Sequence, residues 1–401
     1  MAVTQIARDH AATPPEVLRH EAPLAEAERI ARLQLARSRN VGPRTYLHLI
    51  RRFGSATAAL EALPELAARG GSNGYEMRPR HAVDAELEAG AQVDAQLVIL
   101  GEAAYPHQLA TIDTAPPVLW FIGDNAIFTR PSVAVAGARN ASALGLRTAR
   151  QIARGLGEAG RAVVSGLARG IDAAAHEAAL ETGTIAVLAG GIDRVYPPEN
   201  EGLAQRIVDA GGALLSECPL GVEATARHFP KRNRLVAGLS AGVLLIEAAS
   251  RSGSLITARY GLEQGREVMA CPGSPEDPRS AGCNALIRDG AALVRNARDV
   301  LDALAMPAKM GFAEAGAEFL FDGIDDGDDY DALTDFDPDG RDTDMALAEQ
   351  VIRLVGTAPV EVDELARACG TRPGELSLVL LELELAGRIE QLPDGRVVLM
   401  G

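Results

Sequence analysis

The sequence lacks the features that mark secreted, membrane and metal-binding proteins. Its four cysteines show no CxxC spacing, which argues against a zinc site and against a disulfide framework. No apolar run reaches the roughly 18 residues of a membrane-spanning helix, and the N-terminus has no basic and then apolar signal segment. Aromatic residues amount to only 4%, so aliphatic side chains must fill the core. We therefore expect a cytoplasmic protein with reduced thiols.

Positive charge is also scarce, because the formal net charge of the 401 residues is −16. The acidity is concentrated in residues 311–344, which contain thirteen Asp or Glu and one Arg. This stretch is rich in Asp and Gly and poor in apolar residues, which predicts a disordered linker. Outside it the charges nearly balance, so the net charge does not exclude a surface that binds nucleic acid.

The middle of the chain alternates between short apolar runs and helical patterns. The expected strands are 133–136, 162–165, 184–188, 213–216, 242–246 and 267–270, and the expected helices are 143–156, 171–181, 200–209 and 255–263. This alternation predicts an α/β fold with a parallel, Rossmann-like sheet covered by helices on both faces. Short strands within 95–120 are expected to cover one edge. Ligands of such sheets bind at the carboxyl ends of the strands.

A small helical module precedes the sheet. Residues 25–60 predict two helices around the turn Asn40-Val41-Gly42-Pro43, which resembles a SAM-like or helix-hairpin-helix unit. Helix-hairpin-helix turns hold DNA phosphate on their amides but usually carry two glycines, and this turn has one. A purely structural module and a DNA contact both stay open.

A second helical module follows the acidic stretch. Helical patterns at 347–354, 362–368 and 376–385 precede a β-hairpin, which is typical of a winged helix. The chain is therefore expected to comprise a disordered start (1–22), a helical SAM-like domain (23–92), a Rossmann-like DNA-binding domain (93–305), an acidic disordered linker (306–344) and a winged-helix domain (345–401).

Two arginine-bearing segments are candidates for binding phosphate at the carboxyl ends of the strands. The first is the turn from Gly137 to Ser142, where Arg139 stands at the start of an expected helix. It is not a GxGxxG fingerprint. The second strand ends in Ser165-Gly166 rather than in the acid that holds a ribose, so no NAD and no other cofactor is expected.

The second candidate is the run His228-Phe229-Pro230-Lys231-Arg232-Asn233-Arg234. Its three cations would neutralise DNA phosphates, and Phe229 would offer a surface for stacking a base. Taken alone, the run is equally well interpreted as a solvated basic loop. We expect it to form a basic turn that converges with the Arg139 turn on one groove.

Other polar residues of the sheet are interpreted as structural. His176 lies on a helix with Asp172, but no nucleophile motif accompanies it, so hydrogen bonding within the fold is favoured over catalysis. Asp193 and Glu217 are expected to hold turns or arginines, and Cys271 is expected to be a buried small apolar residue.

Six ordered motifs together resemble the DNA-processing protein A (DprA/Smf) family. They are GARNAS at 137–142, SGLARGID at 165–172, GGIDRVYPPEN at 190–200, FPKRNRLVAGLS at 229–240, SGSLITA at 252–258 and GCNALIRDGA at 282–291. The resemblance covers residues 95–305. It implies a non-enzymatic protein that binds single-stranded DNA as a homodimer, protects it, and loads the RecA recombinase during natural transformation.

The resemblance also implies roles for individual residues. The implied strand contacts are Arg139, Phe229, Lys231, Arg232, Asn233 and Arg234, and the residues implied to shape the same pocket are Gly137, Ser142, Ser165, Gly166 and Arg169. Ile287 and Leu293 align with the dimerisation surface, where RecA is also thought to dock. The family turn more often reads Gly-Ser-Arg, so Ala138 removes one hydroxyl group here.

Two other function classes stay open. A phosphoribohydrolase of the lysine-decarboxylase-like group would need a PGGxGTxxE motif, whereas Gly190-Gly191 is followed here by Ile192-Asp193. A winged-helix DNA-binding regulator would read duplex DNA with residues 373–386, which contain Glu375, Glu382 and Glu384 and no Lys or Arg. Such an acidic surface would repel a duplex.

Overall fold

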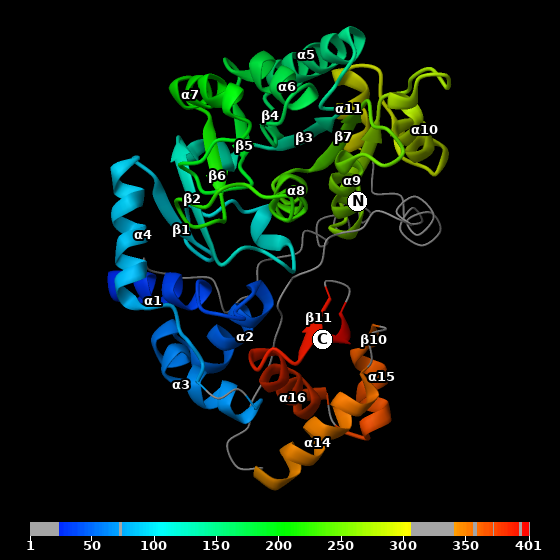
Figure 1. Ribbon diagram of the computed structural model, residues 1–401. Helices are drawn as coiled ribbons and strands as arrows, with labels where there is room; N and C mark the ends of the chain where they lie inside the picture. The colour runs from blue at the N-terminus through cyan, green and yellow to red at the C-terminus, as the bar shows by residue number, and fades with distance from the viewer. Residues whose placement is uncertain are drawn as a thin grey trace, which may run out of the picture.

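The computed structural model describes residues 24–71, 74–305, 341–355, 359–371, 373–392 and 395–400. The expected disordered start, and the acidic linker up to residue 340, lie outside the described residues. Figure 1 shows three parts: a helical domain in blue, a sheet domain from cyan to yellow, and a winged helix in orange and red. No helix within the described ranges is both long and apolar enough to cross a membrane.

The sheet domain contains nine strands in the order β1-β2-β6-β5-β4-β3-β7-β8-β9. The strands are β1 (Gln96–Ile99), β2 (Val118–Gly123), β3 (Ser132–Gly137), β4 (Ala162–Ser165), β5 (Thr184–Val187), β6 (Ala213–Ser216), β7 (Gly242–Ile246), β8 (Glu267–Ala270) and β9 (Ala292–Leu293). From β6 to β9 all neighbours are parallel, while β1 and β2 add an antiparallel edge. The predicted Rossmann-like sheet with a covered edge is confirmed.

Helices cover both faces of this sheet. They are α5 (Ala143–Glu158), α6 (Ile171–Ala179), α7 (Glu201–Asp209), α8 (His228–Gly238), α9 (Gly253–Glu263), α10 (Ala281–Arg288) and α11 (Ala297–Ala305), with short 3₁₀ helices at Leu109–Thr111, Asn125–Thr129, Pro198–Asn200 and Pro278–Ser280. Successive residues of β3 alternate between the faces: Val133 and Val135 pack with α5 and α6, while Ala134 packs with α8 and α9. Both faces are therefore apolar, as a buried parallel sheet requires.

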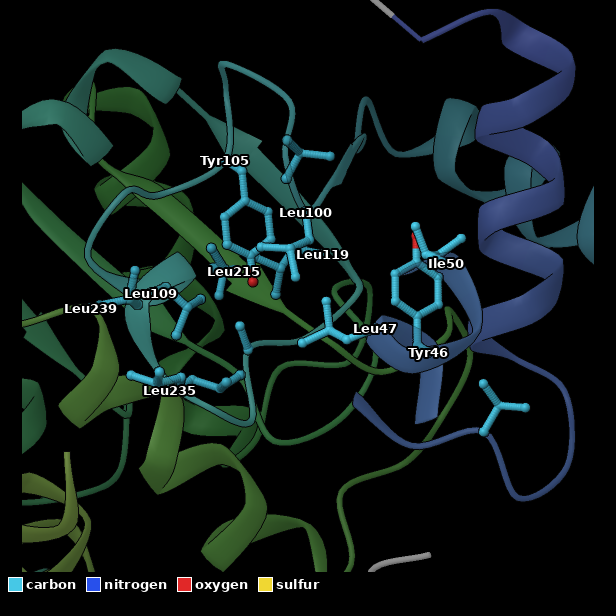
Figure 2. Packing of buried hydrophobic residues seen from close by; sticks show 14 of the residues in the cluster. Tyr46, Leu47, Ile50, Leu100, Tyr105, Leu109, Leu119, Leu215, Leu235 and Leu239 are labelled. Atoms are coloured by element: carbon cyan, nitrogen blue, oxygen red, sulfur yellow. The ribbon is translucent and has the colours of Figure 1, made fainter. Parts of the chain in front are cut away.

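The helical domain shares its core with the sheet domain. It comprises α1 (Glu26–Ala36), α2 (Pro43–Phe53), α3 (Ala56–Arg69) and α4 (Arg80–Gln92). Figure 2 shows Tyr46, Leu47 and Ile50 of α2 in one cluster with Leu119 and Leu215 of the sheet. Because their apolar side chains form one cluster, the two domains are packed as a unit.

A buried carboxylate ties the same two domains together. Arg37 lies 3.0 Å from the carboxylate of Glu86 on α4, and the indole N–H of Trp120 on β2 donates to it at 2.8 Å. A buried charge needs such partners, because an unpaired one loses its hydration without compensation. Glu86 thus fixes α1 and α4 against the edge of the sheet.

The winged helix packs on the helical domain (Figure 1). It comprises α14 (Arg341–Leu354), β10 (Val360–Glu361), α15 (Val362–Cys369), α16 (Pro373–Leu385), β11 (Ile389–Gln391) and β12 (Arg396–Leu399), with strand order β10-β12-β11. The predicted winged helix is confirmed, although α14 already begins inside the range expected to be linker. The expected acidic surface of α16 is wrong at Glu382 and Glu384, which are only 3% and 1% exposed, whereas Glu375 is exposed as expected.

Candidate nucleic-acid interface

A concavity of about 330 Å³ opens at the carboxyl ends of β3, β4 and β5. We call it the Arg139 concavity. Its lining residues are Arg139, Asn140, Gly166, Ala168, Arg169, Tyr196, Pro197 and Phe229. The lining thus combines exposed guanidinium groups with two aromatic rings. This is the edge of the sheet at which ligand binding was expected.

Phe229, in the first turn of α8, contributes an aromatic ring to this concavity. The guanidinium carbon of Arg139 lies 5.0 Å from the centroid of its ring. The ring of Tyr196 meets it edge to face, with centroids 5.6 Å apart, and Tyr196 is 48% exposed. A cation over one ring beside a second accessible ring suits a ligand that carries both negative charge and flat bases.

Arg232 lies beneath Phe229 and is buried rather than accessible. Its guanidinium group donates to the carbonyl oxygens of Gly166 and of Val187, the latter at 2.8 Å. A Cβ atom on Gly166 would stand 2.1 Å from that guanidinium group, so the arginine fits only because residue 166 is glycine. Burial lowers the pKa of Arg232 to about 10, so it still carries its charge at neutral pH. Arg232 therefore supports the concavity from inside.

Asp172 balances this buried charge. Its carboxylate accepts the backbone N–H groups of Gly166 at 3.1 Å and Ala168 at 3.3 Å, which fixes the turn after β4. Burial raises the pKa of Asp172, while the nearby charge of Arg232 and these donors oppose the rise. The two charged groups thus bind the turn after β4, which lines the Arg139 concavity.

The basic run is a helix, so the prediction of a basic turn is wrong. The sequence from His228 onward forms α8, and a helix directs successive side chains to different sides. Arg234 accordingly points inward, where it donates to the carbonyl oxygen of Thr114 and pairs with Glu217. Only part of the run faces the concavity.

Lys231 lies in a second concavity, between the helical domain and the sheet domain. This space of about 370 Å³ is lined by Lys231 and His228 of α8 together with Asn40 and Gly42 of the helical turn, among others. Lys231 is half-buried there. The structure thus divides the predicted strand contacts between two neighbouring concavities, with α8 contributing to both.

The N-terminus of α5, predicted to receive phosphate, is occupied by a carboxylate of the chain itself. Glu247, which follows β7, accepts the backbone N–H of Ser142 at 2.8 Å and the hydroxyl group of Ser142. The same hydroxyl oxygen caps the helix by accepting the N–H of Gly145 at 2.9 Å. A carboxylate favours this position for the same reason as phosphate, the positive end of the helix dipole. Anions must therefore be bound by side chains here.

Three further predicted residues have internal partners. A Cβ atom on Gly137 would stand 1.9 Å from the carbonyl oxygen of Ile246, so this glycine allows β3 and β7 to approach. The hydroxyl group of Ser165 is buried and donates to Val135 at 2.6 Å. The amide of Asn233 donates to the carbonyl oxygen of Gly253 at 3.2 Å. These residues shape the sheet around the concavities and do not line the Arg139 concavity.

The two residues aligned with a dimer surface differ in exposure. Leu293 is 48% exposed and belongs to β9, the outermost strand of the sheet. Ile287 on α10 is partly buried and packs on the core beneath that helix. Leu293 is thus the more accessible of the two.

The residues interpreted as structural have structural partners. His176 is buried, lies 2.7 Å from the hydroxyl oxygen of Thr184 through Nδ1, and has its pKa lowered to about 3 by burial. Asp193 accepts the N–H of Gly221 at 2.8 Å, and Cys271 is buried. Among the described residues, no group of three or more His, Cys, Asp or Glu side chains could hold a metal ion.

Sequence reasoning missed the roles of Tyr196 and Glu247. Tyr196 lies within the motif GGIDRVYPPEN at 190–200, and its accessible ring next to Phe229 is a contact across 33 residues that no spacing rule indicates. Glu247 stands in the left-handed region at φ 54°, which is uncommon for glutamate. An acid directly after a buried strand was the available signal for a group aimed at the carboxyl edge.

The chain is similar to known proteins along most of its length. Residues 96–305 match the family described as DNA recombination-mediator protein A, residues 26–89 match a DprA-like N-terminal HHH domain, and residues 337–395 match a DprA winged helix domain. Protein Smf of Escherichia coli (strain K12) is 38% identical over 321 residues, which cover 80% of this chain and 81% of that protein. DNA processing protein DprA of Streptococcus pneumoniae is 44% identical over 220 residues, or 54% of this chain and 77% of that protein.

A solved structure shares this architecture. The X-ray structure of DNA processing protein A from Streptococcus pneumoniae aligns with a TM-score of 0.57 and 35% sequence identity, covering 68% of this chain and 96% of that one. The family match alone spans more than half of the chain, and the three matched domains follow the order seen in Figure 1. The chain therefore belongs to the DNA recombination-mediator protein A (DprA/Smf) family.

Proposed function

We propose that this chain binds single-stranded DNA in the Arg139 concavity, and that it protects the strand and loads RecA recombinase onto it during natural transformation. The observation that carries the proposal is the placement of the exposed Arg139 guanidinium group 5.0 Å from the ring of Phe229. The family assignment supports a role in DNA recombination, and the relatives are named as DNA-processing proteins.

The chemistry of the concavity favours a single strand over a duplex. Phe229 and Tyr196 offer ring surfaces, and only unpaired bases can leave their neighbours to stack on a side chain. Arg139 supplies charge for the phosphates, since Glu247 fills the anion position at the start of α5. Arg169 also lines the concavity, but its guanidinium group pairs with Glu199, so phosphate must compete with that carboxylate. Little sequence preference is expected, because phosphate contacts position a strand without reading it.

The remaining predicted residues have supporting or assembly roles in this proposal. Lys231 extends the strand path toward the second concavity, while Arg232, Arg234 and Asn233 hold α8 in place. The protein acts as a homodimer through the surface around Leu293 and Ile287, which RecA shares, and it performs no catalytic cycle. We find no support for duplex reading by α16, because that helix is buried on the helical domain.

The test is the affinity and salt dependence of binding to an oligonucleotide of mixed sequence, followed by fluorescence anisotropy. Arg139→Glu should weaken binding by at least about tenfold and reduce the slope of log K against log salt by roughly 0.7, the value for one phosphate contact on a single strand. Arg206→Glu on α7 is the matched control, because its side chain is 55% exposed and lines neither concavity. Equal losses of affinity in both variants would mean that the added negative charge repels DNA wherever it is placed. The assignment of the DNA site to the Arg139 concavity would then be wrong.

A further inference from the structure

A third concavity, separate from those described above, lies between α5 and α11. These two helices lie side by side on one face of the sheet (Figure 1). The space measures about 750 Å³, and four of its nine lining residues are the arginines Arg147, Arg150, Arg154 and Arg298. We call it the arginine cleft. It is a concentrated basic surface on a chain whose net charge is −16.

The spacing of the arginines on α5 explains how the cleft forms. Arg147, Arg150 and Arg154 are three and then four residues apart, so they share one face of the helix. All three are exposed, while Ile152 and Leu156 on the opposite face are buried in the core. A Cβ atom on Gly155 would stand 2.7 Å from the Cβ of Ala297, so the two helices approach closely at this point. That approach brings Arg298 of α11 beside the three arginines of α5.

The positive charge of the cleft is only partly compensated. Arg150 lies 3.5 Å from Glu177, and Arg298 lies 3.8 Å from Asp302, both in exposed pairs. Within the part of the chain that the structure describes, no ion pair or hydrogen bond is recorded for the side chains of Arg147 and Arg154. Of the residues that the structure describes, Glu158 is the one acid that lines the cleft. Exposed pairs of this kind contribute little, and like charges four residues apart destabilise a helix slightly. Folding stability therefore gives no reason to gather these arginines.

We propose that the arginine cleft binds the phosphate backbone of single-stranded DNA as it continues beyond the Arg139 concavity, an inference that rests on the function proposed above. Helix α5 begins at Ala143, four residues after Arg139, and its arginines follow along the axis. Arg147 and Arg154 are about 10 Å apart along that axis, at 1.5 Å per residue, which suits an extended polyanion better than a single phosphate.

The composition of the lining indicates which part of DNA is bound. None of the described residues that line the cleft is aromatic, so these residues offer no stacking surface for bases. Its other polar groups, Gln151 and Asn296, carry amides that can donate to phosphate oxygens. The Arg139 concavity thus holds bases and phosphate, whereas the arginine cleft holds phosphate alone.

The experiment compares a short and a long strand. The double variant Arg147→Gln/Arg154→Gln removes two charges from the cleft and leaves the Arg139 concavity unchanged. Binding is measured by anisotropy with oligonucleotides of about 6 and about 25 nucleotides, of which the first lies near the lower end and the second beyond the upper end of the roughly 4–16 nucleotides that common single-strand modules cover. The long strand should bind about tenfold more weakly, with a salt slope reduced by roughly 1.4, and the short strand should bind as before.

The matched control is Arg80→Gln/Arg353→Gln, which removes two exposed charges, 57% and 76% exposed, from residues that line neither the Arg139 concavity nor the cleft. Equal weakening by this control, or equal weakening of short and long strands, would overturn the proposal. If the double variant left DNA binding intact but lost binding to polyglutamate, the cleft would serve an acidic protein instead. Should Arg139→Glu prove harmless while the cleft variant weakens long strands, the Arg139 assignment alone would fail.

Discussion

Helices α8 and α16 both bury charged side chains, but they differ in what they leave accessible. In α8, Arg232 and Arg234 point inward to backbone carbonyls, while Phe229 remains at the open Arg139 concavity. In α16, Glu382 and Glu384 are buried, and both faces of the helix are covered. Helix α8 therefore begins at an open surface, whereas α16 is covered along most of its length.

The enclosure of α16 has two sources. Leu376, Val379, Leu380 and Leu383 pack in the core of the winged helix, whereas Leu378, Leu381 and Leu385 pack in the core shared with the helical domain. The side-chain amide of Asn40 adds two hydrogen bonds, to the carbonyl oxygens of Glu384 at 3.3 Å and Leu385 at 3.1 Å. The turn that contains Asn40 and Gly42, which the sequence left open as a DNA contact, thus binds the C-terminal end of α16. The difference between the helices teaches that an accessible ligand surface depends on which neighbours pack on a helix.

The largest expected effect concerns the buried Arg232 of α8, which we expect to be required for the stability of the fold. Arg232→Ala should lower the free energy of unfolding by about 3–5 kcal/mol, because it leaves Asp172 uncompensated and two carbonyl groups without their donor. Chemical denaturation followed by circular dichroism measures this loss. DNA affinity should fall as well, since the floor of the Arg139 concavity loosens.

Arg139→Ala is the matched control for that substitution, because both guanidinium groups lie near the ring of Phe229, at 5.0 Å and 6.0 Å. Arg139 is exposed, so its loss should change stability by less than about 1 kcal/mol while weakening DNA binding. If Arg232→Ala were as stable as Arg139→Ala, the assignment of a structural role to Arg232 and of a DNA-contacting role to Arg139 would be wrong.

The sequence was sufficient for the architecture because the strands are short, apolar and bounded by turn residues. Strands β4, β6, β7 and β8 have the predicted bounds, and the grouping of turns at the carboxyl edge follows from parallel order alone. Arg139, Arg169, Gly166 and Phe229 were predicted correctly to lie together, because they belong to neighbouring strand ends and to the helix that covers them.

The remaining features depend on contacts between distant residues. Nothing local distinguishes Lys231 from Arg232, since the direction of each side chain depends on how α8 packs. The pairing of Ser142 with Glu247 joins residues 105 positions apart. For α16 a signal was present: its apolar residues surround the whole helix, which is typical of a helix buried on all sides. Glu382 and Glu384 are buried among these apolar residues despite their charge.

The packing of α16 on the helical domain is tested at Asn40. The backbone of Asn40 stands in the left-handed region at φ 55°, which glycine adopts readily. Asn40→Gly therefore preserves the backbone conformation of the turn while removing both hydrogen bonds to α16. We expect a loss of about 1–2 kcal/mol in local stability, seen as faster hydrogen exchange of the C-terminal half of α16 by mass spectrometry. Asn140→Gly, at the exposed turn of the Arg139 concavity, should leave this exchange unchanged. Unchanged exchange in Asn40→Gly would mean that the apolar contacts alone hold the winged helix.

The smallest effect is expected from removing the winged helix altogether. Deleting residues 345–401 should change the affinity for single-stranded DNA by less than about twofold, because the lining residues of the Arg139 concavity and of the arginine cleft all lie outside this segment. The deletion uncovers apolar side chains of α3, so light scattering must first show that the shortened chain stays monodisperse. A tenfold loss in a monodisperse, folded sample would contradict this comparison. It would assign phosphate contacts to the wing, where Arg388 and Arg396 flank the hairpin, and would make the enclosed module part of the DNA-binding surface.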